Sequence, residues 1–154
     1  MKEIRRHLFK ARREDNDEWV EGGSIVRFSD ENGEILYYMP AQTTNCSTIH
    51  DALTDNIIAI KGVFYKVRPE TVSECTNFTD REGTLLYEGD ICILPDNDEY
   101  KDIEFVIQWE QPTTRFFLTG LGISELYDFE NLAYKNILKI GNIHDREAQA
   151  NDKQ

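Results

Sequence analysis

The residues of this chain most able to do chemistry are its carboxylates, which number 29 among 154 residues. Glu88 and Asp90 lie two positions apart in a short apolar stretch and would share one face of a straight strand. Four further acids lie in one polar loop: Asp96, Asp98, Glu99 and Asp102. Paired or clustered carboxylates can serve as general acid and base, or can bind a divalent cation.

Neither group of acids has the full pattern of such a site. The loop lacks the central glycine and terminal glutamate of a calcium-binding loop. Gly89 interrupts the strand geometry that would place Glu88 beside Asp90. We therefore interpret the loop as a solvated acidic segment and the pair as part of the fold.

Histidines and cysteines show no catalytic or metal-ligand spacing. His7, His50 and His144 are far apart, and His50 adjoins Asp51 in a predicted loop, where a solvated pair is the expected arrangement. The cysteines are odd in number and include no Cys-x-x-Cys motif, which argues against a disulfide framework and a zinc cluster; they are Cys46, Cys75 and Cys92. Cys92 lies between two isoleucines and is predicted to be a small core residue.

Motifs of the common enzyme classes are absent from the sequence. It contains no nucleophile elbow, P-loop or dinucleotide fingerprint, and Gly120-Leu-Gly122 lacks the third glycine of a nucleotide loop. We therefore predict no catalytic residue, no cofactor-binding residue and no metal ligand. The expectation is a protein that is not an enzyme and has no cofactor.

Length and composition are those of a soluble globular protein. A chain of this length can bury a core as one domain or as two small ones. No apolar run approaches the roughly 20 residues that a membrane-spanning helix needs. The N-terminus has charges but no apolar segment behind them, so we expect no signal peptide and a protein that stays in the compartment where it is made.

The net charge of −12 is distributed unevenly. The first thirteen residues are rich in basic side chains, whereas the rest of the chain is strongly acidic. An acidic body repels nucleic-acid phosphates, and the aromatic residues lack basic neighbours, so direct nucleic-acid binding is not expected. We interpret the basic start as a charged edge strand; alternatively, it neutralises the acidic body of the same or a neighbouring subunit.

Turn signals about every ten residues, between short apolar runs, predict a mainly β protein. Asn32-Gly33 is the strongest of these signals. Strands are expected over residues 5–13, 18–28, 34–39, 57–60, 63–67, 103–109, 115–119 and 137–144. The polar segment 41–56 is interpreted as mobile, with a short helical turn at 48–53 as the alternative. One short helix is predicted over 124–132, where Ser124 would be the N-cap and Leu126, Phe129 and Leu132 share a face.

The stretch from Thr79 to Leu94 positions Glu88 and Asp90. A polar run from Asp80 to Gly83 predicts a hairpin turn. Gly89 predicts a bulge or sharp bend between two strands, and Asp90 is expected to accept hydrogen bonds from the backbone of that bend.

This stretch resembles the central signature of the YopX family, small proteins carried by bacteriophages and prophages. The matching residues are Asp80, Gly83, Tyr87, Glu88, Gly89, Asp90 and Ile91. The chain departs from the pattern at Asn77-Phe78, Leu86 and Cys92. A second resemblance covers an N-terminal strand, a polar turn and the next strand, through Phe9, Arg12, Arg13, Glu18, Trp19, Val20 and Gly22. A third covers Ile140, Gly141, Asn142 and Ile143.

Together these patterns predict the fold class and the domains. We expect a mainly β chain with an N-terminal β-region over residues 1–75 and a small half-open β-barrel, similar to a Src-homology-3 barrel, over 76–144. One short helix is expected near the C-terminus, and residues 145–154 are expected to be a fraying polar tail. The resemblance implies a phage or prophage context in the bacterial cytoplasm and assigns no biochemical activity.

Three functions remain open at this point. The preferred one is a non-enzymatic accessory protein that forms a homo-oligomer or binds a phage or host protein. The second is an acidic inhibitor that mimics nucleic-acid charge and occupies a basic site on a host protein. The third is a small metal-dependent enzyme that uses the acidic loops.

Overall fold

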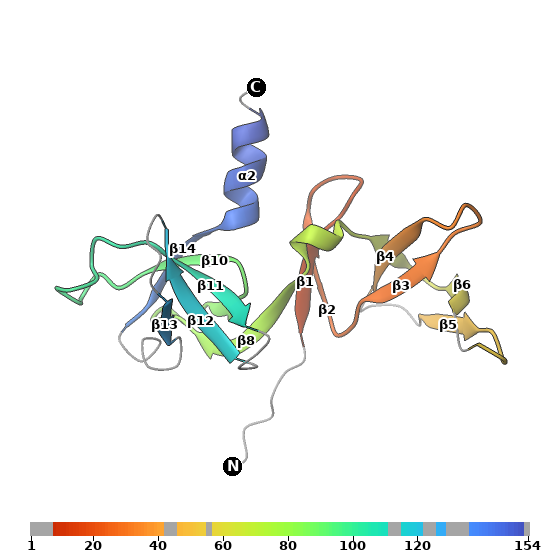
Figure 1. The fold of residues 1–154 in the computed structure, drawn as a ribbon, viewed down its shortest axis with the longest axis horizontal. Helices are drawn as coiled ribbons and strands as arrows, with labels where there is room; N and C mark the ends of the chain where they lie inside the picture. Colours follow the sequence, from red (N-terminus) through yellow and green to blue (C-terminus); the bar gives the residue numbers. More distant parts are fainter. Residues whose placement is uncertain are drawn as a thin grey trace, which may run out of the picture. The chain divides into compact units, whose positions relative to one another are not determined.

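The computed structural model describes residues 8–41, 46–54, 57–110, 115–121, 126–128 and 136–152. Within these ranges the protein is mainly β, as the sequence predicts, and the paired strands are antiparallel. The chain divides into two compact units (Figure 1). We call the described residues up to Glu74 the N-terminal unit and those from Cys75 onward the C-terminal unit.

The N-terminal unit is built from short hairpins. Its elements are β1 (Phe9–Arg12), β2 (Trp19–Gly22), β3 (Val26–Ser29), β4 (Ile35–Pro40), β5 (Ser47–His50), β6 (Ile57–Lys61), β7 (Phe64–Lys66) and the 3-10 helix η1 (Pro69–Thr71). β1 pairs with β2, β4 lies between β3 and β7, and β5 pairs with β6. The end of β1 continues alongside β7, because the backbone N–H of Glu14 donates to the Lys66 carbonyl at 2.9 Å.

A small core holds this unit together. Ala11, Met39 and Val67 are buried in it, and half-buried apolar residues pack around them: Phe9, Val20, Ile25, Tyr37, Tyr65 and Val72. A Cβ placed on Gly22 would lie 2.9 Å from Met39 Cγ and 3.6 Å from the Pro40 carbonyl oxygen. The strand expected over 18–28 is divided at this close approach into β2 and β3.

The β3–β4 turn forms as predicted. Asp30 donates its N–H to the Glu34 carbonyl at 2.9 Å, and its Oδ1 accepts the N–H groups of Asn32 and Glu34. Gly33 has a φ of +79°, in the region that favours glycine.

The segment after β4 differs from expectation. Residues 47–50 form β5 and pair with β6, so the helical turn considered at 48–53 is wrong; residues 42–45 and 55–56 lie outside the described ranges. The strands around Lys61-Gly62 do not pair with each other, since β6 pairs with β5 and β7 pairs with β4. The partner of β7 is distant in the sequence, so local turn signals do not report that pairing, whereas β5 and β6 are neighbours along the chain.

The C-terminal unit contains a five-stranded sheet in the order β13-β12-β11-β10-β14. The elements of this part of the chain are β8 (Ser73–Thr79), β9 (Leu85–Tyr87), β10 (Asp90–Ile93), β11 (Phe105–Glu110), β12 (Arg115–Gly120), β13 (Leu126–Asp128), β14 (Leu138–Asn142) and α2 (Ile143–Asp152). β8 begins in the N-terminal unit, where Ser73 and Glu74 pair with β1, and then pairs with β9. Figure 1 shows α2 leaving the end of β14 and pointing away from the sheet.

The larger core lies in this unit. Its buried members are Leu86, Cys92, Leu94, Phe105, Ile107, Phe116, Leu118 and Ile137, which confirms Cys92 as a core residue. Edge-to-face contacts join Tyr100, Phe105 and Tyr127, and the Trp109 and Phe116 rings lie 5.0 Å apart. These aromatic side chains fill the core.

Two predictions near the C-terminus are wrong. Residues 126–128 of the helix expected over 124–132 form β13 and pair with β12, and the rest of that segment lies outside the described residues. The tail expected from 145 is instead helical as far as Asp152. Pairing with β12 overrides the three-residue spacing of the apolar side chains.

Strand pairing leaves the sheets open. In the described ranges the five-stranded sheet ends at β13 and β14 and does not close into a barrel. The prediction of a mainly β fold is confirmed, but the sheet is open. The β8–β9 turn reaches β14, where the Arg81 N–H donates to the Ile137 carbonyl at 2.9 Å. No helix in the described part of the chain has the length and apolar character needed to cross a bilayer.

Candidate functional site

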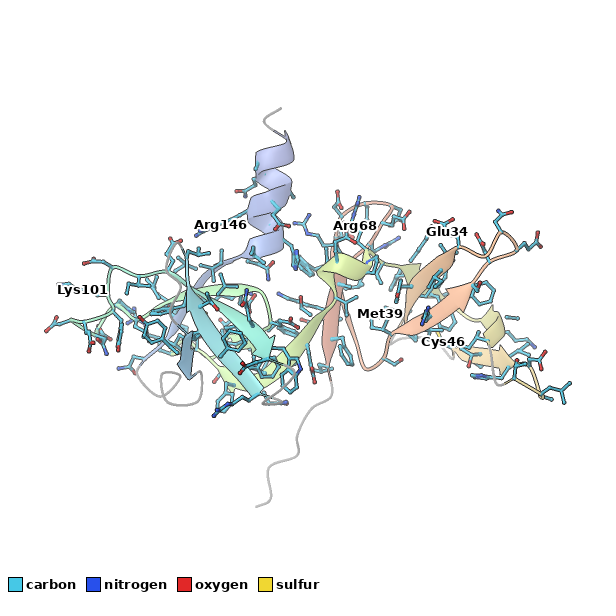
Figure 2. The ribbon with its side chains drawn as sticks, in the orientation of Figure 1. Glu34, Met39, Cys46, Arg68, Lys101 and Arg146 are labelled. Atoms are coloured by element: carbon cyan, nitrogen blue, oxygen red, sulfur yellow. The ribbon has the colours of Figure 1, made fainter. Side chains whose placement is uncertain are left out.

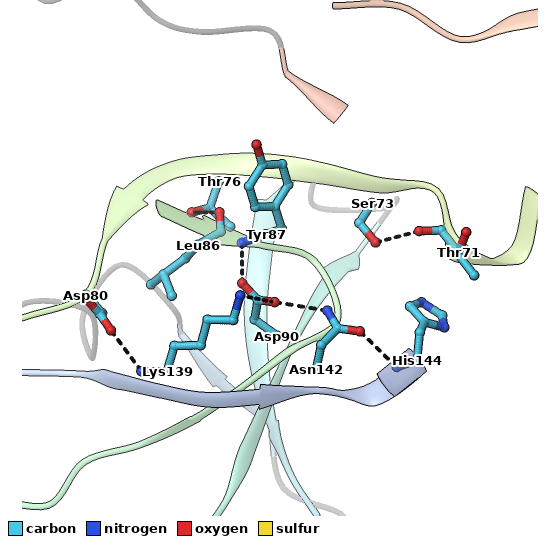
Figure 3. Close-up of polar contacts among 10 residues, drawn as sticks. All are labelled: Thr71, Ser73, Thr76, Asp80, Leu86, Tyr87, Asp90, Lys139, Asn142 and His144. Carbon is cyan, nitrogen blue, oxygen red and sulfur yellow. Dashed lines mark hydrogen bonds and ion pairs between the residues drawn. The ribbon is translucent and has the colours of Figure 1, made fainter. Parts of the chain in front are cut away.

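The bend between β9 and β10 places Asp90 at the centre of a buried polar network (Figure 3). Gly89 makes the bend with a φ of +87°, and Asp90 follows with no exposed surface. Asp90 Oδ2 accepts the Tyr87 N–H at 2.8 Å, and Oδ1 accepts Asn142 Nδ2 at 2.9 Å. Lys139 Nζ lies 3.3 Å from the same Oδ1. The prediction that Asp90 accepts a hydrogen bond from the backbone of this bend is confirmed.

Asn142 carries the network into helix α2. Its Oδ1 accepts the N–H of His144 at 2.8 Å, which caps the first turn of the helix. The Ile143 N–H donates to the Gly89 carbonyl at 2.9 Å, so the bend itself accepts a second backbone group of the helix start. The signature stretch and the third resemblance are thus parts of one hydrogen-bonded junction.

Asp80 organises the turn after β8. Its Oδ1 accepts the N–H groups of Glu82 and Thr84, both at 2.9 Å, and its Oδ2 accepts the Lys139 N–H at 3.1 Å. Burial acts to raise the pKa of Asp80, but the hydrogen bonds from the backbone of Lys139, Thr84 and Glu82 outweigh it, and the pKa is lowered. This carboxylate stays ionised and ties the hairpin turn to β14.

These contacts decide the chemistry of the signature acids. Asp90 is enclosed by Tyr87, Lys139 and Asn142, so its carboxylate is not available to pair with Glu88 on a ligand. Both Asp80 and Asp90 act as acceptors for backbone and side-chain donors at bends. Asp80 and Asp90 are therefore part of the fold.

The acidic loop between β10 and β11 is a run of turns. Asp96, Asp98, Glu99 and Asp102 are exposed. Asp96 forms an ion pair with Arg81 at 3.2 Å, and Asn97 Oδ1 accepts the N–H groups of Glu99 and Tyr100. Lys101 stands in the same loop (Figure 2). Across the described ranges, His, Cys, Asp and Glu side chains form no group that could hold a metal ion.

The histidines and cysteines of the described residues also have structural surroundings that the contacts define. His50 Nε2 lies 2.8 Å from Thr48 Oγ1, while the adjacent Asp51 accepts the N–H groups of Leu53 and Thr54, which lower its pKa. His7 lies outside the described residues. The three cysteines are free thiols, and burial, with the charge of Asp90 second, raises the pKa of Cys92 to about 12.

A cleft of about 400 Å³ opens in the N-terminal unit, lined by Arg13, Glu14, Asp15, Tyr38, Phe64, Tyr65 and Lys66. The Arg13 guanidinium lies over the Tyr65 ring, 4.6 Å from its centroid. Asp15 binds the same guanidinium at 2.9 and 2.6 Å, which raises the pKa of Arg13 and lowers that of Asp15. Lys66 Nζ lies 3.3 Å from Glu14. The cleft combines an aromatic surface with two ion pairs.

The sequence does not predict this cleft. Its residues come from the β1–β2 turn, β4 and β7, which are adjacent only in the folded chain. Arg13 belongs to the second family resemblance, and that is the one sequence signal that pointed to this region.

Comparisons with known proteins agree with this architecture. The sequence model of the family described as "YopX protein" matches residues 8–147. Among solved structures, the crystal structure of protein EF1440 from Enterococcus faecalis is similar, with a TM-score of 0.50, 19% sequence identity, and coverage of 90% of this chain and 94% of that one. That likeness shows a shared fold. No curated protein matches the sequence. Because the family match spans nearly the whole chain, the protein belongs to the YopX family.

Proposed function

We propose that this protein acts without catalysis, as a phage or prophage accessory protein that assembles with itself or binds another protein in the bacterial cytoplasm. The observation that supports this most is a set of exposed aliphatic side chains in the N-terminal unit. Ile35, Ile49, Leu53 and Val63 are between 38% and 96% exposed. Apolar surface in water has an unfavourable free energy that a protein partner removes by covering it.

The use of the acidic side chains also supports a binding role. Asp80 and Asp90 accept hydrogen bonds that hold turns and a helix start. The acids of the β10–β11 loop are spread over an exposed turn region and do not converge on a shared point. A carboxylate that serves as a structural acceptor stabilises the fold without acting on a substrate.

The experiment that tests this function is native mass measurement on tagged protein captured gently from a bacterial lysate. A mass at a multiple of 18.0 kDa, or a second protein at fixed stoichiometry, is the expected result. A mass of 18.0 kDa at every concentration, with no stoichiometric companion, would contradict it.

A second candidate function is charge mimicry of nucleic acid. The observation that favours it is the exposed acidic loop, with Asp98, Glu99 and Asp102, on a chain of net charge −12. Such an inhibitor binds a basic host protein, and added salt weakens the complex. Asn and Gln replacements of these three acids should then weaken capture of that protein; unchanged capture would remove this candidate.

A further inference from the structure

The backbone hydrogen bonds between β4 and β7 alternate in a way that leaves some groups of β7 for another partner. The Val67 N–H donates to the Tyr37 carbonyl at 2.9 Å. Four residues further along β4, the Ala41 N–H donates to the Val63 carbonyl at 2.9 Å. Antiparallel strands exchange such bonds at every second pair of facing residues. Every second residue of β7 therefore directs its backbone N–H and carbonyl away from β4.

Lys66 and Phe64 have this outward direction, because their facing residues on β4 lie between the bonded pairs. The Lys66 carbonyl accepts the Glu14 N–H at 2.9 Å, so the end of the β1 segment occupies that point of the edge. Beyond Glu14 the chain turns away from β7, since the Asp17 N–H donates to the Arg13 carbonyl at 3.1 Å. No described residue bonds to the Phe64 N–H or carbonyl on this edge. The edge of β7 is therefore paired at Lys66 and open at Phe64.

The open part of the edge lies in the cleft of about 400 Å³, of which Phe64 is a lining residue. Phe64 and Tyr38 belong to pairs on one face of the sheet, and Tyr65, the next residue of β7, points to the opposite face. All three aromatic residues line the cleft. A chain extended along this edge would therefore place its alternate side chains against aromatic rings on both faces.

The charges of the lining do not select a charged ligand. Asp15 binds the Arg13 guanidinium at 2.9 and 2.6 Å, and Glu14 lies 3.3 Å from Lys66 Nζ, so each cation already has an acid of the same lining as its partner. The groups that remain are a backbone N–H, a backbone carbonyl and the aromatic rings. The chemical complement of this set is the backbone of an extended peptide with apolar side chains.

We propose that the edge of β7 at Phe64 binds an uncharged, extended segment of another protein. The segment adds a short strand beside β7, in line with the end of the β1 segment, and packs apolar side chains against Tyr38 and Tyr65. This inference rests on the protein-binding form of the proposed function and names the surface and the kind of segment that it recognises.

Peptides selected from a library of random heptapeptides on the immobilised full chain provide the probe. The dissociation constant of the strongest peptide is measured by fluorescence anisotropy, and its core is expected to be uncharged with an apolar side chain at every second position. N-methylation of one residue at a time then removes one peptide N–H and changes no side chain. Methylation of the residue that pairs with Phe64 should weaken binding about tenfold, whereas its two neighbours should tolerate methylation because their N–H groups point away from β7.

A pair of variants at one position tests the same bond from the side of the protein. Phe64→Pro and Phe64→Val both remove the aromatic ring, but only Phe64→Pro removes the N–H. Proline is accepted at a strand edge when its nitrogen faces away from the neighbouring strand, as that of Phe64 does. Phe64→Pro should bind the selected peptide about tenfold more weakly than Phe64→Val does. Thermal unfolding shows whether both variants fold, and the N-methylated peptides test the contact on the wild-type chain in either case.

The outcomes separate this contact from the proposed function. If no peptide is enriched, if methylation weakens binding equally at every position, or if folded Phe64→Pro and Phe64→Val bind equally, the edge contact is wrong. A stoichiometric companion in the native mass measurement would then leave protein binding in place through another surface. If the wild type forms a multimer that Phe64→Pro dissociates and Phe64→Val does not, the edge pairs with a second copy and another protein is the wrong partner. If the peptides behave as expected but the native mass shows neither a multimer nor a companion, the edge contact stands and the proposed function is wrong.

Discussion

Asn142 Nδ2 donates a hydrogen bond of 2.9 Å to Asp90 Oδ1 across 52 positions of the sequence. Both side chains are buried. Asp90 follows the bend between β9 and β10, and Asn142 ends β14 and caps α2, so this one contact joins a bend, a strand and a helix. The two family-pattern residues therefore act together in one junction.

Replacing Asp90 by alanine should lower the free energy of unfolding by about 3 kcal/mol, since the buried donors of Tyr87 and Asn142 lose their acceptor and Lys139 loses its counter-charge. Urea unfolding followed by far-ultraviolet circular dichroism measures the change. Asp96→Ala is the matched control, because it removes an exposed ion pair with Arg81 and should cost less than about 1 kcal/mol. Equal losses in the two variants would refute a structural role for Asp90.

A pair of glycine variants compares this bend with an open turn of similar backbone geometry. Gly89 and Gly83 have nearly equal φ values, +87° and +86°. A Cβ on Gly89 would lie 3.4 Å from Ile143 Cγ2, whereas a Cβ on Gly83 would meet nothing within 4 Å. Both alanine variants should lose about 1 kcal/mol from the positive φ alone. Because 3.4 Å is an ordinary van der Waals distance, the two variants should lose similar amounts of stability, and a much larger loss in Gly89→Ala would show that the bend does not accommodate a side chain.

Local sequence signals account for the turns of this fold. Asp80, Asp30 and Asp90 each receive backbone N–H groups a few residues away, so their roles follow from short-range chemistry. Apolar periodicity does not predict helix α2, because the helix has few apolar side chains and no apolar stripe. The sequence signal for this helix is its N-cap. Asn142 is followed at the third helical position by Asp145, an arrangement that favours the start of a helix.

The sequence did not predict these strand pairings or the cleft. β5 and β6 satisfy each other across a turn, and β13 satisfies its backbone on β12, although the residues 124–132 have the spacing of a helix face. The cleft depends on Arg13 reaching Tyr65 and on Glu14 reaching Lys66, contacts between residues about fifty positions apart. Such pairings are decided by tertiary packing, which propensity and periodicity do not encode.

The lowered pKa of Asp80 makes the free energy of unfolding depend on pH. A carboxylate whose folded pKa is depressed contributes stability above its ordinary pKa of 3.8, and that contribution is lost as the pH falls through the folded pKa. Asp80→Asn removes the titrating group, so the variant should be less stable than wild type at pH 7, and the difference should shrink as the pH is lowered below about 4. The measurement is the free energy of unfolding in urea at pH values from 7 to 3. A difference that stays constant over this range would show that Asp80 does not titrate with folding.

Divalent cations should leave the protein unchanged if the acidic loop is a solvated surface. Asp98, Glu99 and Asp102 are exposed and do not converge with other ligands among the described residues, so binding a cation would require ordering several side chains at an entropic cost. Thermal unfolding with and without millimolar Mg²⁺, Mn²⁺ or Ca²⁺ is expected to give the same midpoint. Because a ligand that binds only the folded state raises the midpoint by mass action, a rise that EDTA reverses would reveal a cation site. Loss of that rise in Asp98→Asn would place the site in this loop and would reopen a metal-dependent activity, whereas its persistence would place the site elsewhere.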